Sequence, residues 1–466
     1  MTLALFFVLL YMLLQLALGI WISRRIKTES DYLIAGRSLG YTLATFSIFA
    51  TWFGAETVIG SAGNAYANGV SLGNAEPFGY GLCLILMGLV FAVPLWRRRL
   101  TTLADLFRIR YSVGVERVAA IILVPSSVLW AAAQVRAFGQ IISSASAGWN
   151  VEYAIGVAAM FTILYTTFGG LLVDAVTDVI QGVLLIAGLL VLFVVVTIDF
   201  GGLDAVVSHL TTSGVVSALP QQRGTWLSIA EEWAIPIFGS VVATELVTRV
   251  IATRSAAVAR RTPLIAGGFY LAIGLIPLTA GLLGSALGIQ LADPEQIIPV
   301  LARELLPTVL YAAFAGAIIS AILSTVDSTL LTASGLLSHN LIVPIARIES
   351  ERSKVLIARG GVLVFGLIAY ALALTADGVF ALVEQASALG SAGCLVAVCF
   401  GLFTSFGGPA AAMAALLSGL LVYIGGATLG WSYPFLASLA VSLTAYVGGG
   451  IVERALSRRV LRRPGT

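Results

Sequence analysis

The sequence predicts an all-α polytopic membrane protein with thirteen transmembrane helices. Of its 466 residues, 59% are hydrophobic and 11% are charged, whereas a soluble domain carries roughly 25% charged residues. The hydrophobic residues gather in runs long enough to cross a bilayer, which requires about 20 residues of helix. Basic residues lie mainly between alternate runs. Together these observations exclude a large soluble domain.

The expected helices follow one another with short polar connections. They cover approximately residues 3–22, 44–67, 78–96, 117–146, 151–168, 174–198, 227–249, 263–287, 308–340, 358–375, 380–404, 409–428 and 433–452. No basic stretch precedes the first helix and no small-residue cleavage site follows it. We therefore expect a retained helix rather than a signal peptide.

The placement of basic residues predicts the orientation in the membrane. Of the 26 Lys and Arg residues, all except Arg136, Arg223 and Arg303 fall in loops on one side or in the C-terminal tail. Cytoplasmic loops carry such an excess, so we expect the N-terminus outside and the C-terminus in the cytoplasm, in the cell (inner) membrane. Because the charges are spread over many loops, a nucleic-acid partner is not expected.

The ninth helix carries polar residues that a lipid-facing helix would lack. Between Ala315 and Ser334, Ser324 and Thr325 share one face with Ala321, while Ser324, Asp327 and Ser328 share the next. A carboxylate at this depth costs about 3 kcal/mol, so it indicates an ion or substrate path. The alternative is that the hydroxyls bond to the preceding helical turn and the small residues only allow close packing.

Two helices have residues that interrupt a helix. The second contains Gly54, Glu56, Thr57 and Gly60 at mid-span, and the seventh contains Pro236 and Gly239. If helices 2–6 and 7–11 are two halves, both breaks fall in the first helix of a half, which is typical of an inverted-repeat transporter with its site at the midplane. The alternative is that packed membrane helices simply tolerate Gly and Pro.

This organisation divides the chain into four parts. We expect an extra first helix and loop at 1–40, a first repeat at 41–198, a second repeat at 199–405, and two peripheral helices with a basic tail at 406–466. An enzyme is not expected, because the sequence has only two His residues, His209 and His339, and no nucleophile with a base at motif spacing.

Arg136 lies in the interior of the fourth predicted helix, away from both of its ends. A guanidinium binds a carboxylate with two parallel hydrogen bonds, so Arg136 indicates a carboxylate-bearing solute. The alternative is an internal ion pair with Glu56 or Glu245 that fixes helix packing.

Five motifs, in order along the chain, carry a resemblance to a known family. They are DYLIAGRSLG (31–40), ATWFGAETVIG (50–60), YTTFGGLLVDAVTDVIQG (165–182), TRVIATRSAAVARR (248–261) and AILSTVDSTLLTAS (321–334). Over about residues 30–405 the chain resembles the sodium:solute symporter family, whose members move proline, pantothenate, sugars, sialic acid, iodide or choline with sodium. The resemblance implies a LeuT-type fold with a five-plus-five inverted repeat.

The resemblance also implies cation sites. The first sodium site would use the carbonyls of Ala50, Phe53 and Ala321 and the hydroxyls of Ser324 and Thr325. A possible second cation site would use Asp178, Ser324, Asp327 and Ser328. Because two nearby carboxylates oppose each other's ionisation, a proton in place of the second sodium is the alternative.

The same resemblance leaves the solute open. Trp52 and Trp130 match aromatic positions that face choline in similar transporters, and aromatic faces attract quaternary ammonium groups. Arg136, Glu56 and the residues near Thr244 depart from that pattern. The expected substrate-binding residues are Trp52, Glu56, Thr57, Trp130, Arg136 and Glu245.

We therefore expect a sodium-coupled symporter that imports a small organic solute by alternating access. An amino acid or other carboxylate ranks first, a choline- or betaine-like cation second and a sugar third. A transporter-like sensor with a separate partner is the alternative from another class. Membrane lipid and the solute are the expected partners, and a monomer is expected to suffice.

Overall fold

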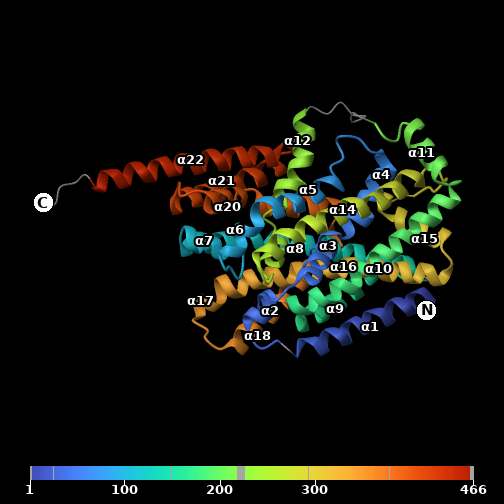
Figure 1. The fold of residues 1–466 in the computed structure, drawn as a ribbon, viewed down its shortest axis with the longest axis horizontal. Coiled ribbons are helices and arrows are strands. Elements are labelled where there is room, and N and C mark those ends of the chain that lie inside the picture. The colour runs from blue at the N-terminus through green and yellow to red at the C-terminus, as the bar shows by residue number, and fades with distance from the viewer. Residues whose placement is uncertain are drawn as a thin grey trace.

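The computed structural model describes residues 3–24, 26–146, 148–217, 226–291, 293–376 and 378–461. Within these ranges the chain is helical, with only two isolated bridges, Leu39 to Thr253 and Val70 to Val216. Figure 1 shows the helices and their labels. The α-helices are α1 (Leu3–Ser23), α2 (Glu29–Ile34), α3 (Tyr41–Trp52), α4 (Ala62–Asn68), α5 (Phe78–Leu86), α6 (Ala92–Arg97), α7 (Ala104–Arg110), α8 (Val113–Ala145), α9 (Val151–Phe168), α10 (Leu171–Asp199), α11 (Leu203–Thr212), α12 (Trp226–Ala234), α13 (Thr244–Ile251), α14 (Ala256–Gly284), α15 (Ile297–Leu305), α16 (Thr308–Leu337), α17 (Val343–Ala346), α18 (Glu351–Thr375), α19 (Val379–Ser391), α20 (Cys394–Phe403), α21 (Pro409–Thr428) and α22 (Pro434–Leu461).

Shorter helical segments join some of these elements. The 3₁₀ segments are η1 (Ala35–Arg37) and η5 (Pro294–Gln296), and the π-helical segments are η2 (Glu56–Ser61), η3 (Met87–Phe91), η4 (Ile235–Gly239) and η6 (Ser338–Ile342).

The described residues contain ten helices that are long and apolar enough to cross a membrane. Two bent pairs raise this number to twelve, and a shorter apolar helix, Leu9–Ser23, lies within α1. The all-α polytopic class is therefore confirmed, and each of the twelve spans overlaps one of the predicted segments. The count of thirteen stays a prediction, because it depends on whether α1 crosses the bilayer.

Both predicted helix interruptions are present. The helix α3 ends at Trp52, and η2 begins at Glu56 after a bend of 49°. In the seventh helix, η4 contains Pro236, and the chain is not helical again until α13 begins at Thr244. Gly lowers helix stability, and Pro removes one backbone donor and clashes with the preceding turn. These residues account for the two breaks.

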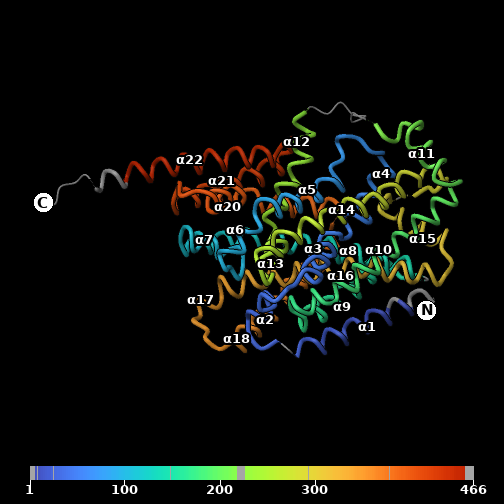
Figure 2. The backbone as a smooth tube through the Cα atoms, in the orientation of Figure 1, coloured from blue at the N-terminus to red at the C-terminus, as the bar shows by residue number. Residues whose placement is uncertain are grey.

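The helices α8 and α16 pack along each other at the centre of the bundle (Figure 1). Against them lie α10 on α16, α19 on α8, and α18 on both, while α3 packs between α10 and α14. The antiparallel pair α21 and α22 forms one edge, and α22 extends beyond the bundle (Figure 2). The helix α3 also contacts α16, so its broken end lies beside one of the two central helices.

One part of the predicted charge distribution is wrong. Arg249 was assigned to a loop, but it lies in the last turn of α13 and its side chain is fully buried. The error arises because the helix continues two residues beyond its predicted end. Arg25, Arg223, Arg462 and Arg463, which also entered the topology prediction, lie outside the described residues.

Candidate functional site

The break in α3 redirects backbone hydrogen bonds toward neighbouring helices. In an unbroken helix the Ala55 N–H would donate to the Thr51 carbonyl. Here it donates to Gln134 Oε1 at 3.0 Å, and the Thr325 hydroxyl donates to the Thr51 carbonyl at 2.9 Å. The hydroxyl face of α16 therefore meets the oxygen atoms that the break exposes.

The residues expected at the first sodium site are buried at this junction. Ala50, Phe53, Ala321, Ser324 and Thr325 are each at most 1% exposed. The Thr325 hydroxyl also lies 3.3 Å from the Ala321 carbonyl. The structure thus brings Thr325 and the Ala321 carbonyl to the break. The Ser324 hydroxyl, by contrast, donates to Asp178 on α10.

The residues expected at the second cation site divide into two groups. In the first, Ser324 donates to Asp178 and Ser328 donates to Asp174 Oδ2 at 3.0 Å. Asp327 forms the second group, because it lies near Gly169 at the junction of α9 and α10. Both carboxylate oxygens of Asp327 are buried without a hydrogen-bond partner among the described residues.

A buried guanidinium lies beside the first group. Arg249 Nη2 is 2.5 Å from Asp174 Oδ2 and 3.8 Å from Asp178 Oδ2. It also donates to the Ser328 hydroxyl, and its Nε donates to Ser47 Oγ at 2.9 Å. Burial of charges is costly unless they are paired. Arg249 is therefore the protein's own counter-charge for these carboxylates.

Several carboxylate oxygens in this region accept no hydrogen bond from the described part of the chain. In addition to both oxygens of Asp327, these are Asp174 Oδ1 and Asp178 Oδ2, of which the latter lies 3.8 Å from the Arg249 guanidinium. Oxygen donors of this kind suit a hard cation such as sodium, or a proton. No group of three or more His, Cys, Asp or Glu in a metal-holding arrangement occurs among the described residues.

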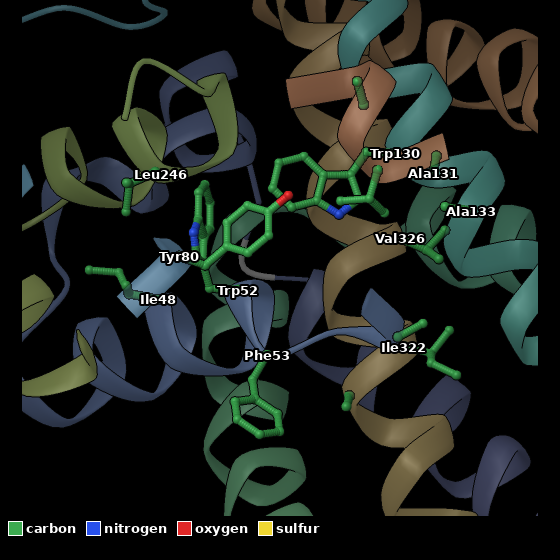
Figure 3. Packing of buried hydrophobic residues seen from close by; sticks show 14 of the residues in the cluster. Ile48, Trp52, Phe53, Tyr80, Trp130, Ala131, Ala133, Leu246, Ile322 and Val326 are labelled. Atoms are coloured by element: carbon green, nitrogen blue, oxygen red, sulfur yellow. The ribbon is translucent and has the colours of Figure 1, made fainter. Parts of the chain in front are cut away.

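Three aromatic rings gather above the break (Figure 3). The Trp52 and Trp130 ring centroids are 5.2 Å apart at 63°, and those of Tyr80 and Trp130 are 6.5 Å apart at 43°. The Tyr80 hydroxyl lies 3.2 Å from Ser387 Oγ. The aromatic cluster, as we call Trp52, Tyr80 and Trp130, therefore joins α3, α5 and α8, and it includes both predicted tryptophans.

Glu56 lies beside this cluster at the start of η2. Its Oε2 accepts a hydrogen bond from Gln134 Nε2 at 2.8 Å, while its Oε1 is buried and unpartnered among the described residues. A Cβ placed on Gly54 would be 2.6 Å from Glu56 Oε2 and 2.8 Å from Thr325 Oγ1. Glu56 and the Thr325 hydroxyl are therefore close neighbours across the break.

Thr57 and Glu245, also expected to bind substrate, take part in protein hydrogen bonds. The Thr57 hydroxyl donates to Glu76 Oε1 at 2.8 Å, and the Tyr270 hydroxyl donates to the same oxygen at 2.8 Å. Glu245 Oε1 accepts from Ser127 at 2.5 Å and from Thr332 at 3.0 Å. The Thr244 hydroxyl is 3.1 Å from that of Ser127. These contacts join α13 and η2 to their neighbours.

Arg136 is hydrogen-bonded to the neighbouring helix α18. Its Nη1 donates to the Ala373 carbonyl of α18 at 3.1 Å. Among the ion pairs of the described residues, none joins Arg136 to Glu56 or Glu245. The alternative of an internal ion pair with Glu56 or Glu245 is therefore not realised among the described residues.

A cavity of about 1110 Å³ lies on the face of the bundle that carries α4, between that helix, α12, η5 and the start of α19. Its lining reaches Gly60 and Phe380, and a Cβ on Gly60 would be 3.2 Å from the Phe380 side chain. A second cavity, of only about 10 Å³, lies between α16, α13 and residues 101–103. The aromatic cluster lines neither cavity, so it is closed in this conformation.

Sequence reasoning missed Tyr80, Gln134, Asp174 and Arg249. Asp174 precedes Asp178 by four residues and so shares its helix face, which was an available signal. Gln134 follows Trp130 by the same spacing. Arg249 gave no such signal, because its role depends on carboxylates of α10 that only the fold brings near.

Comparisons with known proteins find a family and several similar transporters. The model of the sodium:solute symporter family matches residues 32–419. High affinity choline transporter 1 of Homo sapiens is 27% identical over 407 residues, covering 80% of this chain and 68% of that protein. The Drosophila melanogaster protein is 26% identical over 410 residues, covering 82% of this chain and 64% of its own length. The chain thus spans about two thirds of the length of these relatives.

A sodium/pantothenate symporter of Haemophilus influenzae is 28% identical over 325 residues, covering 67% of this chain and 66% of that protein. Among solved structures, a Na⁺-coupled sialic acid symporter is similar with a TM-score of 0.83 and 19% identity, covering 98% of both chains. A nucleobase-cation-symport-1 family transporter has a TM-score of 0.61 and 16% identity, covering 92% of this chain and 96% of its own. These two likenesses show a shared transporter fold. The match over residues 32–419 and the similar curated proteins establish that the chain belongs to the sodium:solute symporter family.

Proposed function

We propose that the protein is a sodium-coupled secondary active symporter of a small organic solute. The observation that carries this proposal is the hydrogen bond from the Thr325 hydroxyl to the Thr51 carbonyl, across the broken helix. Carbonyl and hydroxyl oxygens at such a break bind a monovalent cation weakly enough to release it again. Family membership and the similar sodium symporters support the same activity.

The first sodium site is the pocket of oxygens between α3 and α16. Thr325 and the carbonyls of Ala50, Phe53 and Ala321 supply ligands there, and Ser324 joins them when its hydroxyl turns from Asp178. The carbonyl of Thr51 is an additional candidate ligand, because it already receives a hydrogen bond from Thr325.

A second cation, sodium or a proton, binds among the carboxylates between α10 and α16. The Asp178 and Asp327 oxygens that accept no hydrogen bond from the described residues support this proposal, and Ser324 and Ser328 lie on the same stretch of α16. Arg249 partly neutralises Asp174 and Asp178. A bound cation would therefore stabilise ionised Asp327 more than either of these two carboxylates.

The solute binds at the aromatic cluster. Trp52 and Trp130 supply ring faces and Glu56 supplies a carboxylate, and together they favour a positively charged group. Thr57 and Glu245 would join them once their hydrogen bonds to other protein groups open. These groups favour an amine, an amino acid or a choline-like cation over a simple carboxylate. The proposed role of Arg136 as a carboxylate ligand would require its side chain to leave the Ala373 carbonyl.

Transport proceeds by alternating access through a five-plus-five inverted repeat, residues 41–198 and 199–405. The large cavity faces the outside, and the aromatic cluster is closed by the approach of Phe380 to Gly60. Sodium binding favours the state open to this cavity, and rocking of the bundle then opens the opposite face. A monomer contains all the residues named, so it suffices for transport.

Counterflow of labelled solutes in proteoliposomes tests the proposal. Amino acids, organic acids, quaternary ammonium compounds and sugars are compared in sodium and in potassium. We expect at least one solute to accumulate only in sodium. Equal counterflow of that solute in potassium would contradict sodium coupling, and binding without any counterflow would favour a sensor.

A further inference from the structure

The large cavity has an acidic lining. Its carboxylates are Glu232, Asp293, Glu295 and Glu384, and its described lining residues include no Lys, Arg or His. Clefts lined by charges of one sign concentrate counter-ions and repel ions of the same sign. A path of this kind favours sodium and cationic or zwitterionic solutes, and it disfavours solutes with net negative charge.

Glu56, four residues before Gly60 in the cavity lining, has one oxygen without a hydrogen-bond partner among the described residues. Glu56 is 1% exposed, its Oε2 accepts from Gln134, and its Oε1 has no partner among the described residues. An unsatisfied buried acceptor is costly, and more so when it is charged. A ligand that donates a hydrogen bond to Oε1 would remove that cost.

The position of Glu56 relates it to the aromatic cluster. Trp130 precedes Gln134, the partner of Glu56, by four residues on α8. Four residues correspond to about one helical turn, or roughly 5 Å. The Trp130 ring thus lies about one turn from the amide that binds Glu56, and the Trp52 ring packs against the Trp130 ring, with centroids 5.2 Å apart. A cation against these rings would lie within reach of Glu56.

We propose that Glu56 binds the ammonium group of the solute, and that the solute is an amine with at least one N–H and no net negative charge. This inference rests on the proposed symport and specifies its substrate class. The ring faces of the aromatic cluster attract the positive charge. The N–H donates to Glu56 Oε1, which a fully methylated nitrogen cannot do. Glu56 is therefore the specificity-determining residue, and primary and secondary amines bind better than quaternary ones.

Matched pairs of compounds test this preference in the wild-type protein. Thermal shift and sodium-dependent transport currents are measured for ethanolamine against choline, alanine against its trimethylated betaine, and benzylamine against benzyltrimethylammonium, with propionate as the anion. We expect at least one amine to bind, and its quaternary counterpart to bind at least about tenfold more weakly, since hydrogen bonds to charged groups contribute on this scale. Quaternary compounds that bind as well as the amines, propionate as the only ligand, or no response to any amine would overturn the inference.

Substitution of Glu56 tests whether its carboxylate is the group that accepts the hydrogen bond from the solute N–H. Glu56→Gln keeps an acceptor for Gln134, and we expect it to reduce the preference for the amine at least about tenfold. Glu231→Gln is the matched control, because Glu231 is a buried carboxylate that accepts from the Phe435 and Leu436 N–H groups of α22. It should keep the preference. If Glu76→Gln, rather than Glu56→Gln, removes the preference, the assignment to Glu56 is wrong.

The two proposals fail differently. If transport depends on sodium but amines and quaternary compounds bind equally, the proposal of symport is supported and the proposed preference for amines is contradicted. If the amine preference persists without sodium dependence, the amine inference stands and symport falls. A Glu56→Gln variant that changes only the sodium dependence would make Glu56 a cation ligand and overturn its role toward the solute.

Discussion

At the scale of single residues, the buried polar side chains show which parts of a site a sequence can reveal. Thr325 and the pair Trp52 and Trp130 were predictable, because their spacing on a helix and their residue types already suit a cation and an organic solute. Asp174 and Arg249 were not, because each acquires its role from the other across the bundle. The role of Arg136 toward the solute stays a prediction, since helix position alone does not tell which carbonyl or carboxylate a long side chain will contact, and here Arg136 donates to the Ala373 carbonyl.

The ion pair of Arg249 and Asp174 predicts a coupled stability effect. Arg249→Met leaves Asp174 and Asp178 without a buried counter-charge, and it should lower the free energy of unfolding by about 3–5 kcal/mol. Combination with Asp174→Leu should recover much of that loss, because no unpaired charge remains at position 174. Thermal unfolding in detergent measures both effects. Arg254 is exposed and lies in the connection between α13 and α14, so Arg254→Met should change stability by about 0.5 kcal/mol or less. A double variant no more stable than Arg249→Met alone would contradict the account.

The ionisation of Asp105 should make the free energy of unfolding depend on pH. Burial raises the pKa of this carboxyl, but hydrogen bonds from His339 and from the Thr101 and Thr102 N–H groups outweigh it, and the pKa is lowered from 3.8. Ionised Asp105 therefore stabilises the fold above its ordinary pKa, and this contribution is lost as the pH falls below about 4. Asp105→Asn should flatten the acid limb of the unfolding free energy plotted against pH. An acid limb as steep as that of the wild type would exclude Asp105 as its cause.

At the scale of elements, the apolar segments predicted the spanning helices well, because bilayer thickness constrains their length. The short helices α2, α7, α11 and α15 were not predicted. They lie in connections, where no run of hydrophobic residues marks them. The breaks near Gly54 and Pro236 were predictable from backbone chemistry, but the bend of 47° between α19 and α20 was not. The four-part division of the chain stays a prediction.

The break in α3 leads to a prediction about Gly54. A Cβ at this position would be 2.6 Å from Glu56 Oε2, 2.8 Å from Thr325 Oγ1 and 3.0 Å from Gln134 Oε1. Gly54→Ala should therefore displace these groups and weaken sodium activation of transport at least about tenfold, as overpacking by one methyl group costs about 1–3 kcal/mol. Gly268→Ala on α14, where nothing lies within 4 Å, is the control. Unchanged activation in Gly54→Ala would place the sodium elsewhere.

At the scale of the whole molecule, one face of the bundle is open and the other is nearly closed. The cavity of about 1110 Å³ lies on the face that carries α4, while the opposite side has a cavity of about 10 Å³. The distribution of basic residues predicts that the open face is external. This orientation stays a prediction. The conformation of the bundle could not be predicted from the sequence, since it depends on packing between helices far apart in the chain.

Thiol labelling of intact cells tests this orientation. Asn64→Cys, in the lining of the large cavity, should react with a membrane-impermeant maleimide, whereas Thr102→Cys, in the small cavity, should react at least about tenfold more slowly. Cys83 and Cys394 are buried and Cys399 is half-buried, so the wild-type chain supplies the background. Faster labelling of Thr102→Cys than of Asn64→Cys would contradict the predicted orientation.

Equilibrium binding of radioactive sodium to the purified protein tests most directly whether the ion lies between the broken helix and α16. Wild-type protein should bind sodium saturably, and Thr325→Ser, which keeps the hydroxyl, should retain affinity within a few-fold. Thr325→Ala should weaken binding at least about tenfold, because it removes a ligand without disturbing the fold. Equal sodium affinity in folded Thr325→Ala and wild-type protein would contradict the proposed site.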